Sequence, residues 1–264
     1  MKNIYCYFFI SLPYQRLDKN SYETLAEFVL DLRRIFGNCL RYNVLSSSDS
    51  LRGIATKMLA SSENFLNYFV AKQDTKGTKN DLLYPNLLYC WKSCVEILDS
   101  VLDLKNADDK LQTAWYFLHP VSFFFGGEMS EAYKAYKDKI KSPMDFGTIT
   151  SNVMEGHYQE IDDFVRDCKL VTSNCKAFYQ DDENGKIFTA QAERLENFLS
   201  PRLDALLQFD RSEHGLKAKT KFASPVRIQL LKPPSAFYTS MVDELRRSMY
   251  TDKYTKVRKL LNIP

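Results

Sequence analysis

The sequence has few of the residues that build metal or redox sites. Its 264 residues include six cysteines, none in a Cys-x-x-Cys pair, and only three histidines. A structural zinc site needs four closely spaced ligands of these types. Cys39, Cys168 and Cys175 instead fall on apolar helical faces, where a free thiol behaves as a small hydrophobe. We therefore predict no metal, no cofactor and the reduced cysteines of an intracellular protein.

Catalytic motifs are also missing. The chain contains no glycine-rich phosphate loop, no His-Glu-x-x-His and no Gly-x-Ser-x-Gly, which are short motifs of nucleotide, metalloprotease and hydrolase sites. Its paired acids, Asp162-Asp163 and Asp181-Asp182, fall at an expected helix start and in an expected loop, as solvated charges usually do. The sequence predicts a protein that is not an enzyme.

Long apolar runs and strand alternation are absent too. No apolar run approaches the roughly 20 residues that cross a bilayer, so we predict no membrane partner. No segment alternates apolar and polar residues over the length of a strand, whereas apolar residues recur at spacings of three and four. With 45% hydrophobic and 26% charged residues, the composition is that of a globular protein. The sequence predicts an all-α fold.

What the chain does contain is a repeated segment. Residues 22–43 and 158–179 match at a fixed offset of 136 residues. Identities in register along an amphipathic helix indicate duplicated domains. The two copies differ at their last residue, which is Asn43 in the first and Tyr179 in the second. The identical pairs are Tyr22 and Tyr158, Phe28 and Phe164, Val29 and Val165, Asp31 and Asp167, Asn38 and Asn174, and Cys39 and Cys175.

Apolar periodicity predicts where the helices lie. The polar, glycine-containing stretch 71–81 is expected to be an interdomain linker. A connection over about 106–143 is rich in aromatic residues and longer than most links between helices, which is typical of functional loops. Helices are predicted over 25–40, 51–69 and 87–104, in a short segment after Pro143, and over 161–178 and 186–209.

Positive charge is concentrated at the C-terminal end. Residues 211–264 hold twelve Lys or Arg against four Asp or Glu, although the net charge of the chain is only +3. A basic tail on a neutral to acidic body indicates contact with nucleic acid or an acidic protein surface; a solvated tail is the alternative. We expect residues 217–232 to be extended and residues 235–261 to form an amphipathic helix suited to docking on a partner.

Residues 85–208 resemble a bromodomain, a left-handed four-helix bundle that binds acetyl-lysine. Trp115-Tyr116-Phe117 resembles the family's Trp-Pro-Phe shelf, and His119-Pro120-Val121 contains its Pro-Val pair. Tyr136 takes the place of a tyrosine that holds a pocket water, while Pro143-Met144-Asp145 and Asn174-Cys175 match motifs at the second and third helices. The resemblance implies an acetyl-lysine site formed by Trp115, Tyr116, Phe117, Val121, Tyr136, Phe178, Tyr179 and, as the gatekeeper, Ile187 or Phe188.

Residues 12–72 resemble the same family through the run from Asn38 to Asn43, which reads Asn-Cys-Leu-Arg-Tyr-Asn. The resemblance implies that Asn43 donates to the acetyl carbonyl, with Tyr42, Leu51 and Asn38 around it. An asparagine that only caps the helix end is the alternative. Because 42 residues precede Asn43, we expect this copy to lack its first helix and most of its long loop. The predicted helix at 235–261 is a candidate to take the place of the missing one.

The chemistry of the ligand explains these residue types. Acetyl-lysine is a neutral amide on an apolar stem, so its reader needs an apolar slot and a donor for the carbonyl. An unpaired buried carbonyl costs about 1–3 kcal/mol. Asparagine donates through its NH2 group and accepts a backbone N–H. Tyr179 is longer, so it either fills the slot or reaches the acetyl oxygen from further out, and Phe123-Phe124-Phe125 either line the slot or pack the loop.

The sequence thus predicts two bromodomains in tandem, similar in layout to tandem bromodomain factors of protozoan parasites. The expected divisions are a first domain over 1–72, a linker over 73–84, a second domain over 85–208 and a basic tail over 209–264. The resemblance implies a nuclear reader of acetylated histone or other acetylated protein tails, with chromatin complex subunits as further partners. The alternatives are a degenerate tandem that acts as a scaffold without reading acetyl-lysine and, third, a direct nucleic-acid binder.

Overall fold

A computed structural model of the chain describes residues 16, 19, 21–22, 25–42, 49–74, 87–104, 113–180 and 182–222. Every regular element in these ranges is helical, which confirms the predicted all-α fold. Among the described helices, none combines the length and the apolar character needed to span a membrane.

Tertiary contacts divide the chain into two units. The larger unit consists of Phe36–Asn64 and Pro85–Pro225, and the smaller of Met1–Ile35, Phe65–Tyr84 and Val226–Pro264. These divisions cut through the first copy of the repeat and differ from the expected division into 1–72, 85–208 and 209–264. The expected domain boundaries therefore stay a prediction.

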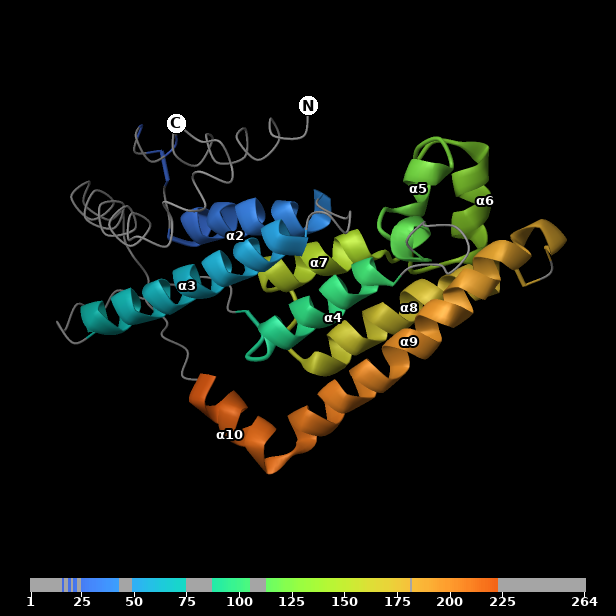
Figure 1. Ribbon diagram of the computed structural model, residues 1–264. Coiled ribbons are helices and arrows are strands. Elements are labelled where there is room, and N and C mark those ends of the chain that lie inside the picture. Colours follow the sequence, from blue (N-terminus) through green and yellow to red (C-terminus); the bar gives the residue numbers. More distant parts are fainter. Residues whose placement is uncertain are drawn as a thin grey trace. The chain divides into compact units, whose positions relative to one another are not determined.

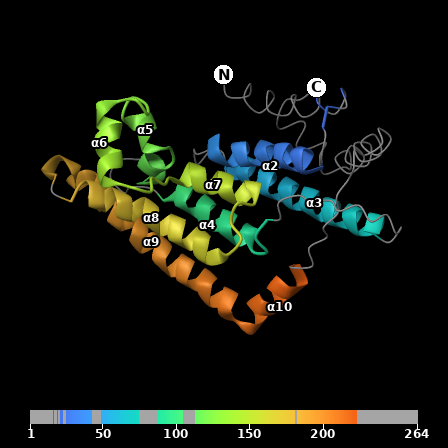
Figure 2. The ribbon, with the colours of Figure 1, turned by 180° about the vertical axis from the view of Figure 1, so that it is seen from behind.

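Four helices form the core of the larger unit: α4 (Trp91–Asp103), α7 (Phe146–Glu155), α8 (Ile161–Phe178) and α9 (Lys186–Arg211). Their apolar residues are buried against one another, and α8 and α9 lie side by side (Figures 1 and 2). The predicted helices occur in these four places. The sequence pattern placed the start of α4 at residue 87, but the helix begins at Trp91.

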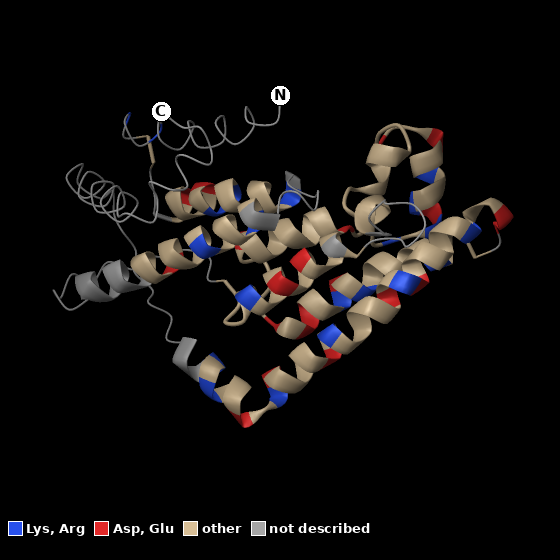
Figure 3. Ribbon diagram, in the orientation of Figure 1, with Lys and Arg blue, Asp and Glu red and all other residues tan. Residues whose placement is uncertain are grey.

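The apolar stripe of the second copy explains which face α8 buries. Phe164, Cys168 and Val171 recur at spacings of three and four and are almost inaccessible to solvent. Charged residues of both signs are interspersed along α8 and α9 (Figure 3), and Lys176 pairs with Glu196 at 2.6 Å. Exposed pairs contribute only about 0–1 kcal/mol each, so burial of the apolar stripe is the main stabilising interaction of this helix pair.

The aromatic connection contains a 3-10 turn, η2 (Thr113–Phe117), and two short helices, α5 (Val121–Phe124) and α6 (Glu131–Lys139). These helices differ from the predicted single loop. Four residues of α5 are too few to show a helical period, and α6 has few apolar residues. Ser130 caps α6 by accepting a hydrogen bond from the backbone N–H of Tyr133 at 3.1 Å. Both helices lie at one end of the bundle (Figures 1 and 2).

The second copy of the repeat contains a buried tyrosine–aspartate pair. The Tyr158 hydroxyl donates to Asp167 Oδ2 at 2.9 Å. The Tyr158 ring packs edge-on against Phe164, with ring centroids 5.9 Å apart. Burial raises the pKa of Tyr158, so the hydroxyl remains a donor. This pair ties the segment that precedes α8 to the helix itself.

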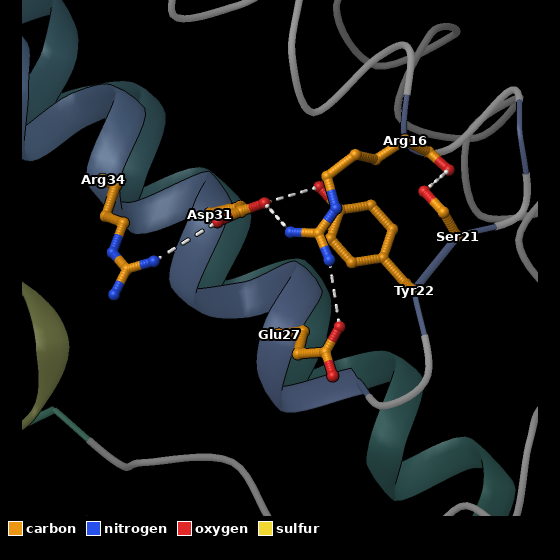
Figure 4. A network of polar contacts seen from close by, with 6 residues as sticks. All are labelled: Arg16, Ser21, Tyr22, Glu27, Asp31 and Arg34. Carbon is orange, nitrogen blue, oxygen red and sulfur yellow. Dashed lines mark hydrogen bonds and ion pairs between the residues drawn. The ribbon is translucent and has the colours of Figure 1, made fainter.

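The first copy forms the same pair within the smaller unit. The Tyr22 hydroxyl donates to Asp31 at 3.0 Å, and its ring meets Phe28 edge-on at 5.5 Å. Figure 4 shows Arg16 beside this pair, joined to Asp31 at 2.6 Å and to Glu27 at 3.1 Å. Residues that match at the offset of 136 therefore also have the same local structure.

Parts of the first-copy helices belong to the larger unit. These are the end of α2 (Leu25–Tyr42) and the start of α3 (Asp49–Asp74). Arg52 of α3 is fully buried and pairs with Asp99 of α4. Arg41 of α2 donates from Nη1 to the Ser151 hydroxyl of α7 at 3.1 Å. First-copy residues thus pack on two helices of the second-copy bundle.

The last described helix is α10 (Glu213–Phe222). Lys217 pairs with Glu213 one turn earlier at 2.6 Å, and Lys219 pairs with Glu160 before α8 at 2.5 Å. The prediction of an extended chain from residue 217 is wrong for 217–222, which are helical; the pair between Lys217 and Glu213, one turn apart, favours the helix. The rest of that segment and the helix predicted over 235–261 lie outside the described residues.

Candidate functional site

A cavity of about 260 Å³ lies where the connection meets the ends of α8 and α9. Its volume is slightly below the roughly 300–1,000 Å³ usual for small-molecule sites, which suits a ligand the size of one side chain. The lining is mostly aromatic and aliphatic. It consists of Tyr116, Phe117, His119, Val121, Phe124, Phe125, Tyr136, Met144, Asp145, Val171, Cys175, Phe178, Tyr179 and Phe188.

Aromatic rings pack against one another along one wall of the cavity. Tyr179, which follows the last residue of α8, stacks on Phe188 of α9 with centroids 5.0 Å apart and 18° between the planes. Tyr116 meets Phe188 edge-on at 5.3 Å, and Phe178 meets Tyr136 edge-on at 5.1 Å. Such pairs each contribute about 0.5–1.5 kcal/mol beyond burial, so they hold the wall in one arrangement.

Two of the residues that line the cavity, Tyr136 and Tyr179, carry phenol hydroxyls. Tyr136 is 3% exposed, and burial raises its pKa to about 12. Burial also raises the pKa of the half-buried Tyr179. Both groups are therefore protonated at neutral pH and can donate. Within the described part of the chain, neither hydroxyl has a hydrogen-bond partner, so each is available to a ligand.

Gly185 makes room for the Tyr179 ring. Its φ of −82° is open to any residue, but a Cβ here would lie 2.3 Å from Cδ1 and 2.6 Å from Cβ of Tyr179. Space, not backbone conformation, thus requires glycine at this position. The placement of Tyr179 in the cavity wall depends on the residue at the start of α9.

Hydrogen bonds hold the end of the connection against α8. Asn174 of α8 donates to the carbonyl oxygen of Ser142 at 2.8 Å. Lys139, the last residue of α6, donates to the carbonyl oxygen of Phe178 at 2.9 Å, where a cation is favoured by the helix dipole. The end of α6 and the segment after it are therefore both anchored to the C-terminal half of α8.

Asp145 joins this anchor to α7. Its carboxylate caps the helix by accepting hydrogen bonds from the Thr148 N–H at 2.9 Å and the Thr148 hydroxyl at 2.6 Å. Burial raises the pKa of Asp145, and the hydrogen bonds from Thr148 act in the opposite direction. Since both carboxylate oxygens are engaged, Asp145 is a structural part of the cavity lining.

Most residues predicted for the second-copy site do line the cavity, but Trp115 and Ile187 do not. Trp115 is 38% exposed and Ile187 is 57% exposed. Neighbouring side chains in a helical turn point about 100–120° apart, so Tyr116 and Phe188 face the cavity instead. Of the two gatekeeper candidates, only Phe188 is among the residues that line the cavity. The predicted residues that line the cavity are Tyr116, Phe117, Val121, Tyr136, Phe178, Tyr179 and Phe188.

Several lining residues fell outside the predicted site. Val171 and Cys175 precede Tyr179 at intervals of four, so helical spacing alone was a signal that they share its face. Phe124 and Phe125 line the cavity, whereas Phe123 is 68% exposed. The other unassigned lining residues are His119, Met144 and Asp145.

The first-copy site is described only in part. Asn43 lies outside the described residues, and Tyr42 is described only as the end of α2. Asn38 is half-buried on α2, and Leu51 is half-buried in the first turn of α3. An acetyl-lysine site formed by these four residues stays a prediction.

A contact of the matched cysteines shows which residue of the first copy corresponds to Phe188. The Cys39 thiol lies 3.8 Å from the carbonyl oxygen of Leu51, and the Cys175 thiol lies 3.5 Å from that of Phe188. Since Cys39 and Cys175 are matched in the repeat, Leu51 and Phe188 occupy equivalent places. The loop before the fourth helix is therefore one residue longer in the second copy.

Comparisons with known proteins agree with this architecture. The bromodomain family model matches residues 10–54 and 94–193, more than half of the chain. The chain is 30% identical over 114 residues, 43% of its length, to bromodomain adjacent to zinc finger domain protein 2A of Xenopus laevis. It is 36% identical over 88 residues, 33% of its length, to bromodomain-containing factor 2 of Saccharomyces cerevisiae. These alignments span 6% and 12% of the two relatives.

Proposed function

The chain belongs to the bromodomain family, and we propose that its second copy binds acetyl-lysine in the cavity between Tyr116, Tyr179 and Phe188. One observation carries the proposal: a mostly aromatic cavity of about 260 Å³ that is lined by Tyr136 and Tyr179. Apolar walls accept a neutral acetylated side chain and disfavour unmodified lysine, because they do not compensate the desolvation of its ammonium group.

The position of Tyr179 supports a role as donor. Its ring lies flat against Phe188 in the wall, so the cavity remains open despite the replacement of the family's asparagine. A phenol hydroxyl donates one hydrogen bond, which is worth about 0.5–1.5 kcal/mol net. We therefore expect acetyl-lysine to be bound less tightly than by a bromodomain with asparagine at this position.

The test is a titration of the full-length, isotopically labelled chain with an acetylated histone-tail peptide and its unmodified form, followed by NMR. We expect saturable shifts for residues around the cavity with the acetylated peptide only. Tyr179→Phe retains the ring on Phe188 and removes the hydroxyl, so it should weaken binding by about threefold to tenfold.

Tyr89→Phe is the matched control. The Tyr89 hydroxyl donates to Asp210 at 2.9 Å near the end of α9, and neither residue lines the cavity. Loss of the Tyr89 hydroxyl should leave peptide affinity unchanged. Equal affinity of wild type and Tyr179→Phe would exclude Tyr179 as the donor, and an absence of saturable shifts with any acetylated peptide would overturn the proposal.

The wider role follows from the same ligand. The family resemblance implies acetylated histone tails as the ligand class, and we include in the proposal that the protein acts in the nucleus with chromatin complex subunits as partners. Reading an acetylated tail requires no catalysis, so we include in the proposal that the chain is not an enzyme. Contact of the basic tail with nucleic acid would show a steep dependence of DNA affinity on salt.

A scaffold that does not read acetyl-lysine is the second candidate. It is favoured by the exposed apolar residues of the connection, where Trp115, Phe123 and Met129 are 38%, 68% and 84% exposed. Exposed apolar patches often mark protein interaction sites. Under this hypothesis Tyr179 would only complete the wall, and no acetylated peptide would saturate the NMR shifts.

A further inference from the structure

The first turn of α7 lies between two cavities. On one side, Met144 and Asp145 line the cavity of about 260 Å³. On the other side, Phe146 and Gly147 line a cavity of about 30 Å³. That volume corresponds to about one water molecule, so the residues around the second space are closely packed. A residue on its far side can therefore influence α7 and, through α7, the wall of the larger cavity.

Arg41 of α2 forms that far side. It lines the small cavity together with Leu40 of the same helix. Its guanidinium donates to the Ser151 hydroxyl of α7 at 3.1 Å. A Cβ built on Gly147 would lie 3.5 Å from Arg41 Nε and 3.0 Å from Asp145 Oδ1. The guanidinium is thus packed beside the capped N-terminus of α7, close to the Asp145 carboxylate.

The connection to the larger cavity continues through neighbouring residues. Phe117 lines the larger cavity, and the next residue, Leu118, lines the small one. The carbonyl oxygen of Leu118 would lie 2.5 Å from a Cβ on Gly147, so this part of the shelf rests directly on the first turn of α7. Displacement of that turn would move Phe117 and Met144 together.

We propose that Arg41, contributed by the first copy of the repeat, is a positioning residue for the acetyl-lysine cavity of the second copy. It acts by fixing the first turn of α7 through Ser151 and by placing a positive charge beside Asp145. A residue of the first copy thereby stabilises the α7 side of the second copy's site. This inference rests on the proposed function of that cavity.

Electrostatics supports the same arrangement. Burial raises the pKa of Asp145, while the hydrogen bonds from Thr148 and the charge of Arg41 oppose that rise. A protonated Asp145 would lose part of its capping interaction with α7. The other titratable groups around this site are Tyr116, His119, Tyr136, Cys175 and Tyr179 in the larger cavity and Asp99 in the small one.

The experiment compares Arg41→Ala, Arg41→Lys and Ser151→Ala in the full chain. Affinity for an acetylated histone-tail peptide is measured between pH 5 and 8. Arg41→Ala should weaken binding about tenfold at pH 7, with a larger loss toward pH 5, because Asp145 then protonates at a higher pH. Arg41→Lys should restore most of the affinity, and Ser151→Ala should weaken binding by about threefold.

Arg211→Ala is the matched control for loss of one positive charge. Arg211 pairs with Asp162 at 3.5 Å, and its side chain is 69% exposed. This variant should bind as the wild type does. The proposal is overturned if Arg41→Ala and Ser151→Ala bind the peptide with wild-type affinity and pH dependence. A loss in Arg41→Ala that Arg41→Lys does not reduce would also contradict it.

A second readout separates this inference from the proposed function. The pKa of the Asp145 carboxyl is followed by carbon-detected NMR without peptide, and it should rise in Arg41→Ala but not in Arg211→Ala. If that rise occurs while no acetylated peptide binds the wild type, the proposed function fails and the contact stands. If the wild type binds but the pKa of Asp145 does not move in Arg41→Ala, the inference fails alone.

Discussion

The two copies of the repeat share one hydrogen bond, from a tyrosine before the helix to an aspartate within it. The bond joins Tyr158 to Asp167 in the second copy and Tyr22 to Asp31 in the first. Around this shared feature the two copies differ. The second copy has η2, α5 and α6 beside α8, and these elements close a cavity over the end of that helix. The end of α2, in the first copy, packs on α7 instead. The comparison teaches that matched helices can meet different neighbours, because half of the residues that line the second-copy cavity come from the connection.

The largest effect is expected where first-copy and second-copy helices are joined. Asp99→Ala removes the ion pair of Arg52, which is fully buried. Loss of one partner of a fully buried pair costs about 3–5 kcal/mol; because Asp99 is 36% exposed, we expect a cost toward the lower end of that range. Urea unfolding should show this loss in the free energy of unfolding. If residues 36–64 contributed little to the larger unit, the variant would unfold as the wild type does.

Asp163→Ala is the control for Asp99→Ala. Asp163 pairs with Arg166 at 2.5 Å on the surface of α8, where the two side chains are 39% and 64% exposed. Exposed pairs contribute about 0–1 kcal/mol. A similar loss of stability in both variants would mean that burial of Arg52 does not strengthen its pair with Asp99.

The next effect tests the shared tyrosine–aspartate pair. Tyr158→Phe removes a hydrogen bond to a buried carboxylate, which is worth about 1.5–3 kcal/mol. Tyr22→Phe should cost less, because Asp31 retains its ion pair with Arg16 at 2.6 Å. Thermal unfolding of both variants measures the difference. Equal costs in the two variants would show that the ion pairs of Arg16 do not compensate for loss of the Tyr22 hydrogen bond.

Substitution by alanine should have opposite effects on stability at two glycines near the N-terminal ends of α3 and α9. Gly185→Ala forces a Cβ against Tyr179, so it should cost about 1–3 kcal/mol and disturb the cavity. At Gly53, in α3, an added Cβ would have no atom within 4 Å, so Gly53→Ala should stabilise by about 0.5–1 kcal/mol. Unfolding curves and peptide titrations test both, and a neutral Gly185→Ala would contradict the assigned packing of Tyr179.

The smallest effect at neutral pH comes from the cavity tyrosine. The pKa of Tyr136 is raised from about 10 to about 12. Between these values the unfolded chain loses the proton and the folded chain retains it. The contribution to stability is therefore complete below pH 10 and is lost as the pH rises through 12. Tyr136→Phe should weaken this alkaline loss, which unfolding at pH 8 to 11 would measure.

Much of the cavity could be predicted from residue types and spacing. The family motifs in the connection place Tyr116, Phe117 and Val121 near one another, and helical spacing places Phe178 and Tyr179 at the end of α8. The choice between Ile187 and Phe188 could not be made, because it depends on the rotation of α9 after a loop one residue longer than in the first copy. Which of Phe123, Phe124 and Phe125 face the cavity depends likewise on the packing of α5.

By itself, the sequence determined the long helices, their buried faces, the repeat and the family, because these depend on residues close in the chain. Tertiary structure alone decided that Arg41 and Arg52 pack on α7 and α4, and that Gly185 accommodates Tyr179. These contacts join residues 6 to 110 positions apart, with no periodic signal between them. They depend on how side chains fill the space between helices, which spacing along one helix does not encode.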